Sequence, residues 1–268
     1  MKRREFLSQL KKSSLLLPLS IVTQSSASNI YAPKDSFFNL KSTLLSNDIF
    51  LDAEYIAALH SVRNKLKYVQ RYVGHGNFNI LGFDDTRKIL KHSAKAVDFT
   101  REELSFIEYI FYYKPDIHGF YGDRISLNLT NRINRKDVKK IPYTGHFLFK
   151  GKPEETYYKI TKDIGKTVIL TSGVRSIVKQ MKLFLDKLNA TNYNLSKTSN
   201  SIAPPAFTYH TVGDFDVGKK GLGSSNFTAR FALTPEFNKI KKLKYIDMRY
   251  TINNKDGVRY EPWHVKII

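Results

Sequence analysis

Residues 210–217 read His-Thr-Val-Gly-Asp-Phe-Asp-Val, a turn followed by a short apolar strand that carries acids. Successive side chains of a strand point to opposite faces, so Asp214 and Asp216 would share one face and Phe215 would occupy the other. This alternation predicts a strand that packs on a core with one face and presents carboxylates on the other. The imidazole of His210 stands at the entrance to the segment.

Two further segments offer side chains that suit one chemistry. Residues 172–176 read Ser-Gly-Val-Arg-Ser, and residues 261–264 read Glu-Pro-Trp-His. The three segments together supply two imidazoles, several carboxylates and a guanidinium, and the sequence has no cysteine that would offer a competing thiolate site. A catalytic zinc site takes three protein ligands, keeps one position open for water and works with a nearby base. The pattern therefore predicts a zinc peptidase with one Zn²⁺ per chain.

The three segments also resemble the signature of the zinc D-alanyl-D-alanine carboxypeptidases of the VanY and VanX type. That family shows a Ser-Gly-Tyr-Arg-Ser-like segment, a His-x-x-Gly run that ends in Asp, and Glu-x-Trp-His. The resemblance covers roughly residues 150–268, and three motifs in the family's order are far more specific than any one of them. It implies the hedgehog-type zinc peptidase fold and hydrolysis of the terminal D-alanine from peptidoglycan stem peptides.

The resemblance implies that His210, Asp216 and His264 bind the metal. The family's Asp follows its first His by seven residues, whereas Asp216 follows His210 by six and Asp214 by four. Asp216 is preferred because residues 215–217 match the family's apolar-Asp-apolar strand, which requires a one-residue deletion in the turn. Asp214 is then an alternative ligand or a partner that orients a ligand histidine. The shortened interval also motivates a second hypothesis, a non-catalytic cell-wall-binding protein that keeps the fold.

Glu261 is the predicted general base, which takes a proton from water and passes it to the leaving amine. Arg175 is predicted to stabilise the negative charge that develops at the scissile carbonyl, although it could instead bind the terminal carboxylate of the substrate. In an ideal strand Glu261 and His264 would point to opposite sides. Their convergence on one metal requires a bend, which Pro262 would permit.

The remaining candidates are weaker. Predicted substrate contacts are Ser172, Gln180, Tyr209 and Trp263, and Val174 stands where the family usually has an aromatic residue. His146 is a minor pocket candidate. The other histidines are interpreted as polar residues outside the site; they are His60, His75, His92 and His118. Which bond is cleaved (D,D-, L,D- or an internal crosslink) stays open, as does the oligomeric state.

Residues 1–28 have the three-part layout of a secretory signal. A basic start precedes an apolar run over residues 13–23 and small residues at 25–28. Arg3 and Arg4 resemble the twin-arginine export signal. The apolar run is too short to span a bilayer comfortably, and no other apolar stretch is longer. These features predict a mature protein without a transmembrane segment in the periplasm or at the cell wall.

The formal net charge of +20 would attract the protein to an anionic polymer. Export disfavours nucleic acid as that polymer, and the chain lacks the basic-aromatic motif of a recognised nucleic-acid module. Peptidoglycan, whose stem peptides carry carboxylates, is the predicted partner.

The organisation along the chain predicts an α+β fold in which a small antiparallel sheet with flanking helices carries the zinc site. Residues 29–140 are predicted to be mostly helical and residues 141–268 to form the peptidase domain. Within the helical part, apolar spacing marks a helix over 52–73, a second runs from Asp84 or Asp85 to about Val97, and a capping-box pattern at Thr100–Glu103 starts a third. In the second half, helices are expected over 154–164, 176–188 and 235–243, and strands over 167–170, 215–217, 245–251 and 258–268.

Overall fold

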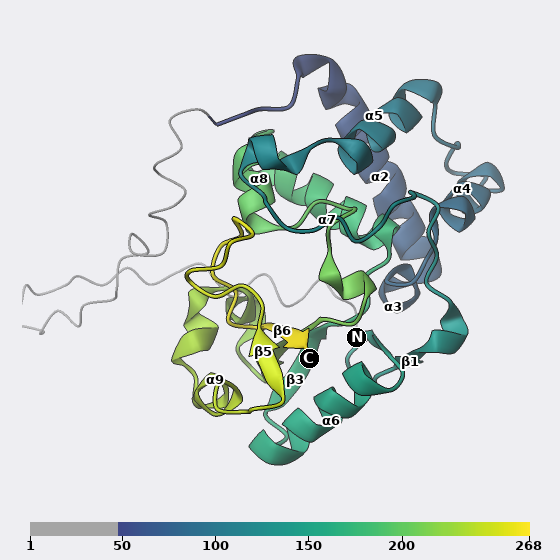
Figure 1. Cartoon of the computed structure of the whole chain (residues 1–268). Coiled ribbons are helices and arrows are strands. Elements are labelled where there is room, and N and C mark those ends of the chain that lie inside the picture. Colours follow the sequence, from purple (N-terminus) through teal and green to yellow (C-terminus); the bar gives the residue numbers. More distant parts are fainter. Residues whose placement is uncertain (1–47) are drawn as a thin grey trace, which may run out of the picture. The chain divides into compact units, whose positions relative to one another are not determined.

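A computed structural model describes residues 48–268 of the chain (Figure 1). The predicted export signal lies outside the described residues. Of the helices that are described, none combines the length and the apolar character that a membrane span requires.

Helices fill most of the first half and strands appear from residue 138 onward. The α-helices are α2 (Ile56–Val73), α3 (His75–Phe78), α4 (Phe83–Lys91), α5 (Arg101–Tyr112), α6 (Lys152–Ile164), α7 (Ile177–Ala190), α8 (Leu195–Ser201) and α9 (Pro235–Ile240). The strands are β1 (Val138–Lys140), β2 (Phe147–Phe149), β3 (Val168–Ser172), β4 (Phe215–Lys219), β5 (Ile246–Met248) and β6 (His264–Ile267). Short 3₁₀ helices are η2 (Ala53–Tyr55), η3 (Pro115–His118), η4 (Arg135–Asp137), η5 (Tyr209–Thr211), η6 (Gly223–Phe227) and η7 (Ala229–Leu233).

A four-stranded antiparallel sheet with the order β3-β4-β6-β5 forms the frame of the C-terminal half. Strand β4 lies inside it, with Val217 opposite Leu170 of β3 and Asp216 opposite His264 of β6. Strands β1 and β2 form a separate antiparallel pair. The predicted α+β class with a small antiparallel sheet is confirmed.

One face of the four-stranded sheet is apolar and is covered by α6 and α9. Phe215 and Val217 of β4 are fully buried in a core that includes Ile160 of α6 and Ile240 of α9. Because side chains alternate along a strand, Asp216 between them points to the opposite face. The apolar residues thus fix the orientation of the strand, and the acid is turned toward the candidate site.

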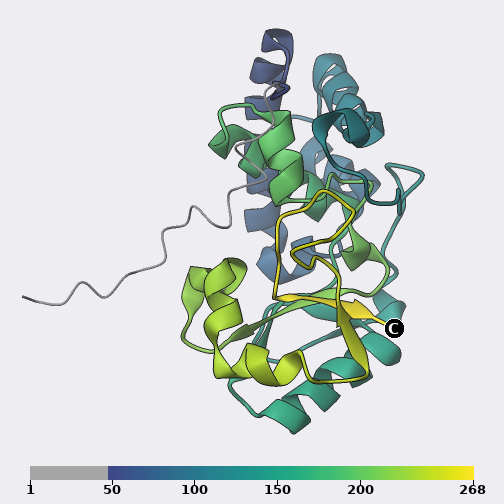
Figure 2. The same ribbon diagram turned by 60° about the vertical axis from the view of Figure 1, so that its left-hand side comes forward.

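Helix α7 lies between the sheet and the helices α2 and α5, as Figures 1 and 2 show. Its apolar side, which includes Met181, Phe184 and Leu188, is buried in one core together with residues of α2 and α5. Ser176 caps its start by accepting a hydrogen bond from the backbone N–H of Lys179 (3.2 Å). The N-terminal helices therefore pack on an element of the C-terminal half, while the division predicted at residue 141 stays a prediction.

Helix α4 is shorter than the sequence predicts. It ends at Lys91, whereas the expectation ran to about Val97. The hydroxyl of Ser93 accepts hydrogen bonds from the backbone N–H groups of Lys95 and Ala96, at 3.1 Å each. A serine side chain that satisfies these donors offers the backbone an alternative to the helix.

The last two strands are also shorter than expected. Strand β5 ends at Met248 rather than Thr251, and β6 begins at His264 rather than Val258. The connection between them includes Gly257, which has a φ of +74° and whose Cβ, if it had one, would overlap the carbonyl oxygen of Gly119. Only glycine fits this position, and the tight approach ties the connection to the N-terminal half.

Candidate metal centre

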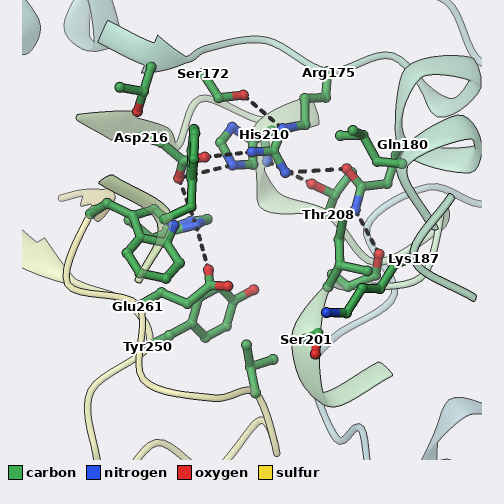
Figure 3. A pocket seen from close by; sticks show the side chains of 18 of the residues that line it. Ser172, Arg175, Gln180, Lys187, Ser201, Thr208, His210, Asp216, Tyr250 and Glu261 are labelled. Atoms are coloured by element: carbon green, nitrogen blue, oxygen red, sulfur yellow. Dashed lines mark hydrogen bonds and ion pairs between the residues drawn. The ribbon is translucent and has the colours of Figure 1, made fainter. Parts of the chain in front are cut away.

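Three buried side chains from separate elements meet beside the sheet: His210 on η5, Asp216 on β4 and His264 at the start of β6 (Figure 3). Asp216 Oδ1 lies 3.4 Å from His210 Nε2 and 3.3 Å from His264 Nδ1. One ligand atom from each residue lies within 4.8 Å of the other two. The β4–β6 register brings two of the three residues together, because it places Asp216 directly opposite His264.

Two of the facing atoms have no ordinary partner. His210 Nε2 and Asp216 Oδ1 are buried and accept or donate no hydrogen bond within the described part of the chain. Buried polar atoms are nearly always hydrogen-bonded, so such a pair calls for an explanation. Two imidazole nitrogens and one carboxylate oxygen form a donor set that zinc prefers at catalytic sites. The residues present therefore fit a zinc ion.

The far nitrogen of each imidazole is held by an acceptor behind it. His210 Nδ1 lies 2.8 Å from the carbonyl oxygen of Gly173, and His264 Nε2 lies 3.1 Å from Asp214 Oδ2. If each of these nitrogens carries the proton, the opposite nitrogen of each ring is free to bind a metal. Such partners fix the orientation of ligand histidines in metal sites.

Asp214 lies behind His264, just before β4 begins, and does not join the three facing atoms. Besides His264, its carboxylate accepts hydrogen bonds from Arg249 Nε and from the backbone N–H of Ile267 (3.2 Å). Of the two acids that the sequence left as alternatives, Asp216 lies between the two imidazoles, and Asp214 lies at the far nitrogen of His264.

The charges of the cluster suit metal binding. Burial and the neighbouring Arg175 lower the pKa of His210 to about 4, so the ring is neutral near pH 7. Burial alone would raise the pKa of Asp216, but His210 and Arg175 outweigh it and hold that pKa well below its usual range. A neutral imidazole and an ionised carboxylate are the forms that bind a metal.

Glu261 lies at the edge of the cluster, with its Oε2 3.8 Å from His264 Nδ1. The backbone bends between the two residues, because His264 N–H donates to the carbonyl oxygen of Glu261 (3.2 Å) and β6 starts only at His264. The bend that convergence requires is therefore present. Burial raises the pKa of Glu261 to about 7, although His264 and Arg259 oppose the shift.

Arg175 joins the cluster from the segment between β3 and α7. Its Nη2 lies 2.5 Å from Asp216 Oδ2, its Nε donates to Ser172 Oγ (2.8 Å), and its Nη1 is 3.4 Å from Gln180 Oε1. Gln180 is itself fixed, since its amide donates to the carbonyl oxygen of Ala203 (2.7 Å). Ser172 and Gln180 thus contact the guanidinium as well as lining the cavity.

The cluster opens into a cavity of about 510 Å³, within the range of small-molecule sites. Trp263 and His146, both singled out from the sequence, line it. Tyr209 does not: its hydroxyl donates to Asp123 (3.1 Å), and the guanidinium of Arg249 lies 3.4 Å from its ring centre.

Sequence reasoning missed several residues of the cavity wall, among them Thr208, Tyr250, Lys187 and Arg259. A signal existed for those on α7. The wall uses Lys179, Gln180, Leu183, Asp186 and Lys187, which repeat at helical spacing opposite the apolar stripe. No comparable pattern marks Tyr250, because it lies in an irregular segment.

Comparisons with known proteins find one family model that matches the region of the cluster. The family model described as VanY, D-alanyl-D-alanine carboxypeptidase, matches residues 155–268. The matched residues form the C-terminal part of the chain, less than half of its length. The match spans the three residues of the cluster together with Asp214, Arg175 and Glu261, and it begins inside α6. Among curated proteins, none matches the chain.

Several solved structures are similar to part of the chain. The VanY D,D-pentapeptidase of the VanB-type resistance cassette, in complex with Zn(II), is 19% identical over 48% of this chain and 77% of its own, with a TM-score of 0.36. The D,D-dipeptidase VanXYg with a D-Ala-D-Ala phosphinate analog is 18% identical over 47% and 52%, with a TM-score of 0.42. The LD-carboxypeptidase LdcB is 18% identical over 59% and 70%, with a TM-score of 0.37.

Proposed function

We propose that the protein is a zinc-dependent D,D-carboxypeptidase that removes the terminal D-alanine from peptidoglycan stem peptides outside the cytoplasm. The observation that carries this proposal is the buried cluster of His210, Asp216 and His264 with unpaired facing atoms, next to a carboxyl whose pKa is about 7. The match of residues 155–268 to the model of the VanY D-alanyl-D-alanine carboxypeptidases supports the substrate class.

In this proposal His210 Nε2, His264 Nδ1 and Asp216 hold one Zn²⁺ per chain. Zinc, when bound, lowers the pKa of water and polarises a carbonyl. Glu261 accepts the proton of the attacking water and delivers it to the leaving amine. A pKa near 7 suits both transfers, because the group can be either base or acid near neutral pH.

Arg175 supplies positive charge to the reaction. Its guanidinium lines the cavity and is positioned by Ser172 and Gln180. A fixed cation at this place stabilises the negative charge that develops on the scissile carbonyl oxygen. Trp263, packed edge to face with Phe227, forms an apolar part of the same wall.

The test is the substitution Glu261→Ala in the mature protein, assayed on diacetyl-L-Lys-D-Ala-D-Ala. Release of D-alanine should fall by about 10²–10⁴-fold, the usual contribution of a general acid–base group, while zinc content stays near that of the wild type. Glu155→Ala is the matched control, because Glu155 is exposed on α6. Full activity of Glu261→Ala would refute the mechanism.

The same preparation separates the alternatives. Peptides ending in L-Lys-D-Ala, and crosslinked dimers, test the L,D- and endopeptidic specificities. Zinc that is bound without turnover on any of these substrates would favour the non-catalytic cell-wall-binding protein. The structure weakens the reason for that alternative, since the shortened interval after His210 does not separate Asp216 from the imidazoles.

A further inference from the structure

The cavity extends well beyond the metal cluster, along the polar face of α7. Gln180 contacts Arg175 at one end, and Lys187 lines the cavity at the other. Seven residues of helix correspond to a rise of about 10 Å. An extended peptide advances about 3.3 Å per residue, so the second residue before the scissile bond lies about 7 Å from it, and the side chain of that residue covers the remaining distance to the far end.

Two cations stand at that far end without an acidic hydrogen-bond partner. Lys187 forms no ion pair or side-chain hydrogen bond with any of residues 48–268, and Figure 3 shows its end directed into the cavity. Arg259 donates through Nη2 to the carbonyl oxygen of Phe227 (3.3 Å), but its buried Nε has no hydrogen-bond partner in the described part of the chain. Glu261 Oε1 lies 3.8 Å from that Nε, within ion-pair distance but too far for a hydrogen bond.

The two cations are close enough to repel each other. Burial and the charge of Arg259 lower the pKa of Lys187. Holding like charges together in a half-buried wall is unfavourable unless an anion binds between them.

The acid nearest to Lys187 in sequence does not neutralise it. Asp186 also lines the cavity, but its carboxylate is engaged by Arg63 (3.1 Å) and by Lys182 (2.5 Å). The positive charge of Lys187 is therefore left for a ligand.

We infer that Lys187 and Arg259 form a subsite for a carboxylate on the substrate, carried by the side chain of the residue that precedes the terminal D-Ala-D-Ala. This inference rests on the proposed function, because it takes the metal cluster as the position of the scissile bond. It makes the enzyme selective for acidic stem peptides.

The experiment compares two peptides that differ in one group: diacetyl-L-Lys-D-Ala-D-Ala, which is neutral at Nε, and the same peptide with an Nε-succinyl group, which ends in a carboxylate. Wild-type protein should bind the succinyl peptide with the lower KM. In Lys187→Gln the ratio of the two KM values should move toward one by about tenfold, a loss typical of a partly desolvated charge pair. Lys187→Arg should restore the ratio.

Lys242→Gln is the matched control, because Lys242 is exposed and lies outside the cavity wall. An equal rise in KM for both peptides in Lys187→Gln, with an unchanged melting temperature, would overturn the inference. It would indicate that Lys187 binds the terminal carboxylate, which both peptides share. An unchanged ratio in Lys187→Gln would overturn it as well.

A binding measurement separates this inference from the proposed function. In the Glu261→Ala background, calorimetry with the same two peptides reports affinity without turnover. If wild-type protein cleaves neither peptide, the proposed function fails, while a preference for the succinyl peptide that Lys187→Gln removes would still establish the subsite. Equal affinities for the two peptides, in Glu261→Ala with and without Lys187→Gln, would reject the subsite and leave the proposed function standing.

Discussion

Asp214 and Asp216, two residues apart, differ in partners rather than in chemistry. Asp216 faces both imidazoles and Arg175, whereas Asp214 accepts from the rear nitrogen of His264 and from Arg249. The proposed division gives one acid to the metal and the other to the orientation of a ligand ring. Groups behind metal ligands are known to set affinity.

Asp214→Ala should lower zinc affinity about 10–100-fold. The substitution leaves the Nε2–H of His264 and the guanidinium of Arg249 without their acceptor, so the ring loses its fixed orientation. Competition against a chromogenic chelator would measure the change.

Asp247→Ala is the control for that substitution, since Asp247 is an exposed acid on β5 of the same sheet. An affinity for zinc equal to that of the wild type in Asp214→Ala would contradict the orienting role.

At the scale of elements, the start of α5 shows how a local motif also joins two helices. Thr100 Oγ1 accepts from Glu103 N–H (3.3 Å), and Glu103 Oε2 accepts from Thr100 N–H (2.8 Å). The capping box predicted there is confirmed. The same carboxylate also binds Lys65 of α2 at 2.5 Å and Ser61, so it fixes α5 against α2.

Glu103→Ala should lower the free energy of unfolding by about 1.5–3 kcal/mol at pH 7, the range for hydrogen bonds to a charged group. Burial opposes ionisation of Glu103, but Lys65, Ser61 and the cap outweigh it and lower the pKa of its carboxyl below 4.5. A lowered folded-state pKa means that this stability is present above the unfolded pKa and is lost as the pH falls through the folded pKa.

Urea unfolding at several pH values would test this dependence. The difference between wild type and Glu103→Ala should shrink as the pH drops from 6 toward 3. Glu108→Ala serves as the control, because Glu108 is exposed on α5 and should change stability by about 0.5 kcal/mol or less. If the difference in the free energy of unfolding between wild type and Glu103→Ala does not depend on pH, the ionised carboxylate of Glu103 is not the source of the stabilisation.

At the scale of the whole molecule, the cavity depends on both halves of the chain. Its α7 wall is held from behind by the helices of the N-terminal half, which bury Ile177, Met181, Phe184, Leu185 and Leu188 in a shared core. We propose that the N-terminal helices support this wall.

Residues 141–268 alone should therefore fail to fold cooperatively, although the VanY match lies within them. Removing the N-terminal helices would expose large apolar side chains of α7, each worth about 1.5–3 kcal/mol. Their sum is comparable to the whole stability of a typical domain, about 5–15 kcal/mol.

Thermal unfolding followed by circular dichroism, on residues 48–268 and on 141–268, would check this. A sharp transition in the shorter chain at a similar temperature would support two independent domains with the predicted boundary.

Local signals in the sequence were enough to locate most of the longer helices, though not the end of α4, and to choose the residue types at the site. Apolar spacing located α2 and α7, the Thr100–Glu103 pattern located the start of α5, and three motifs indicated His210, His264, Glu261 and Arg175. These signals work because helix periodicity, caps and motif spacing depend on neighbours within a few residues.

The tertiary structure decided what depends on distant neighbours. Sheet register put Asp216 rather than Asp214 opposite His264, and the late start of β6 turned Glu261 toward the same cavity. Lys187 and Arg259 share one cavity wall only because α7 and the segment before β6 line the same cavity. Asp216 and His264 are 48 positions apart (264 − 216), and Lys187 and Arg259 are 72 apart (259 − 187). The packing of cores and the pairing of strands, not local propensity, set the distances between such residues.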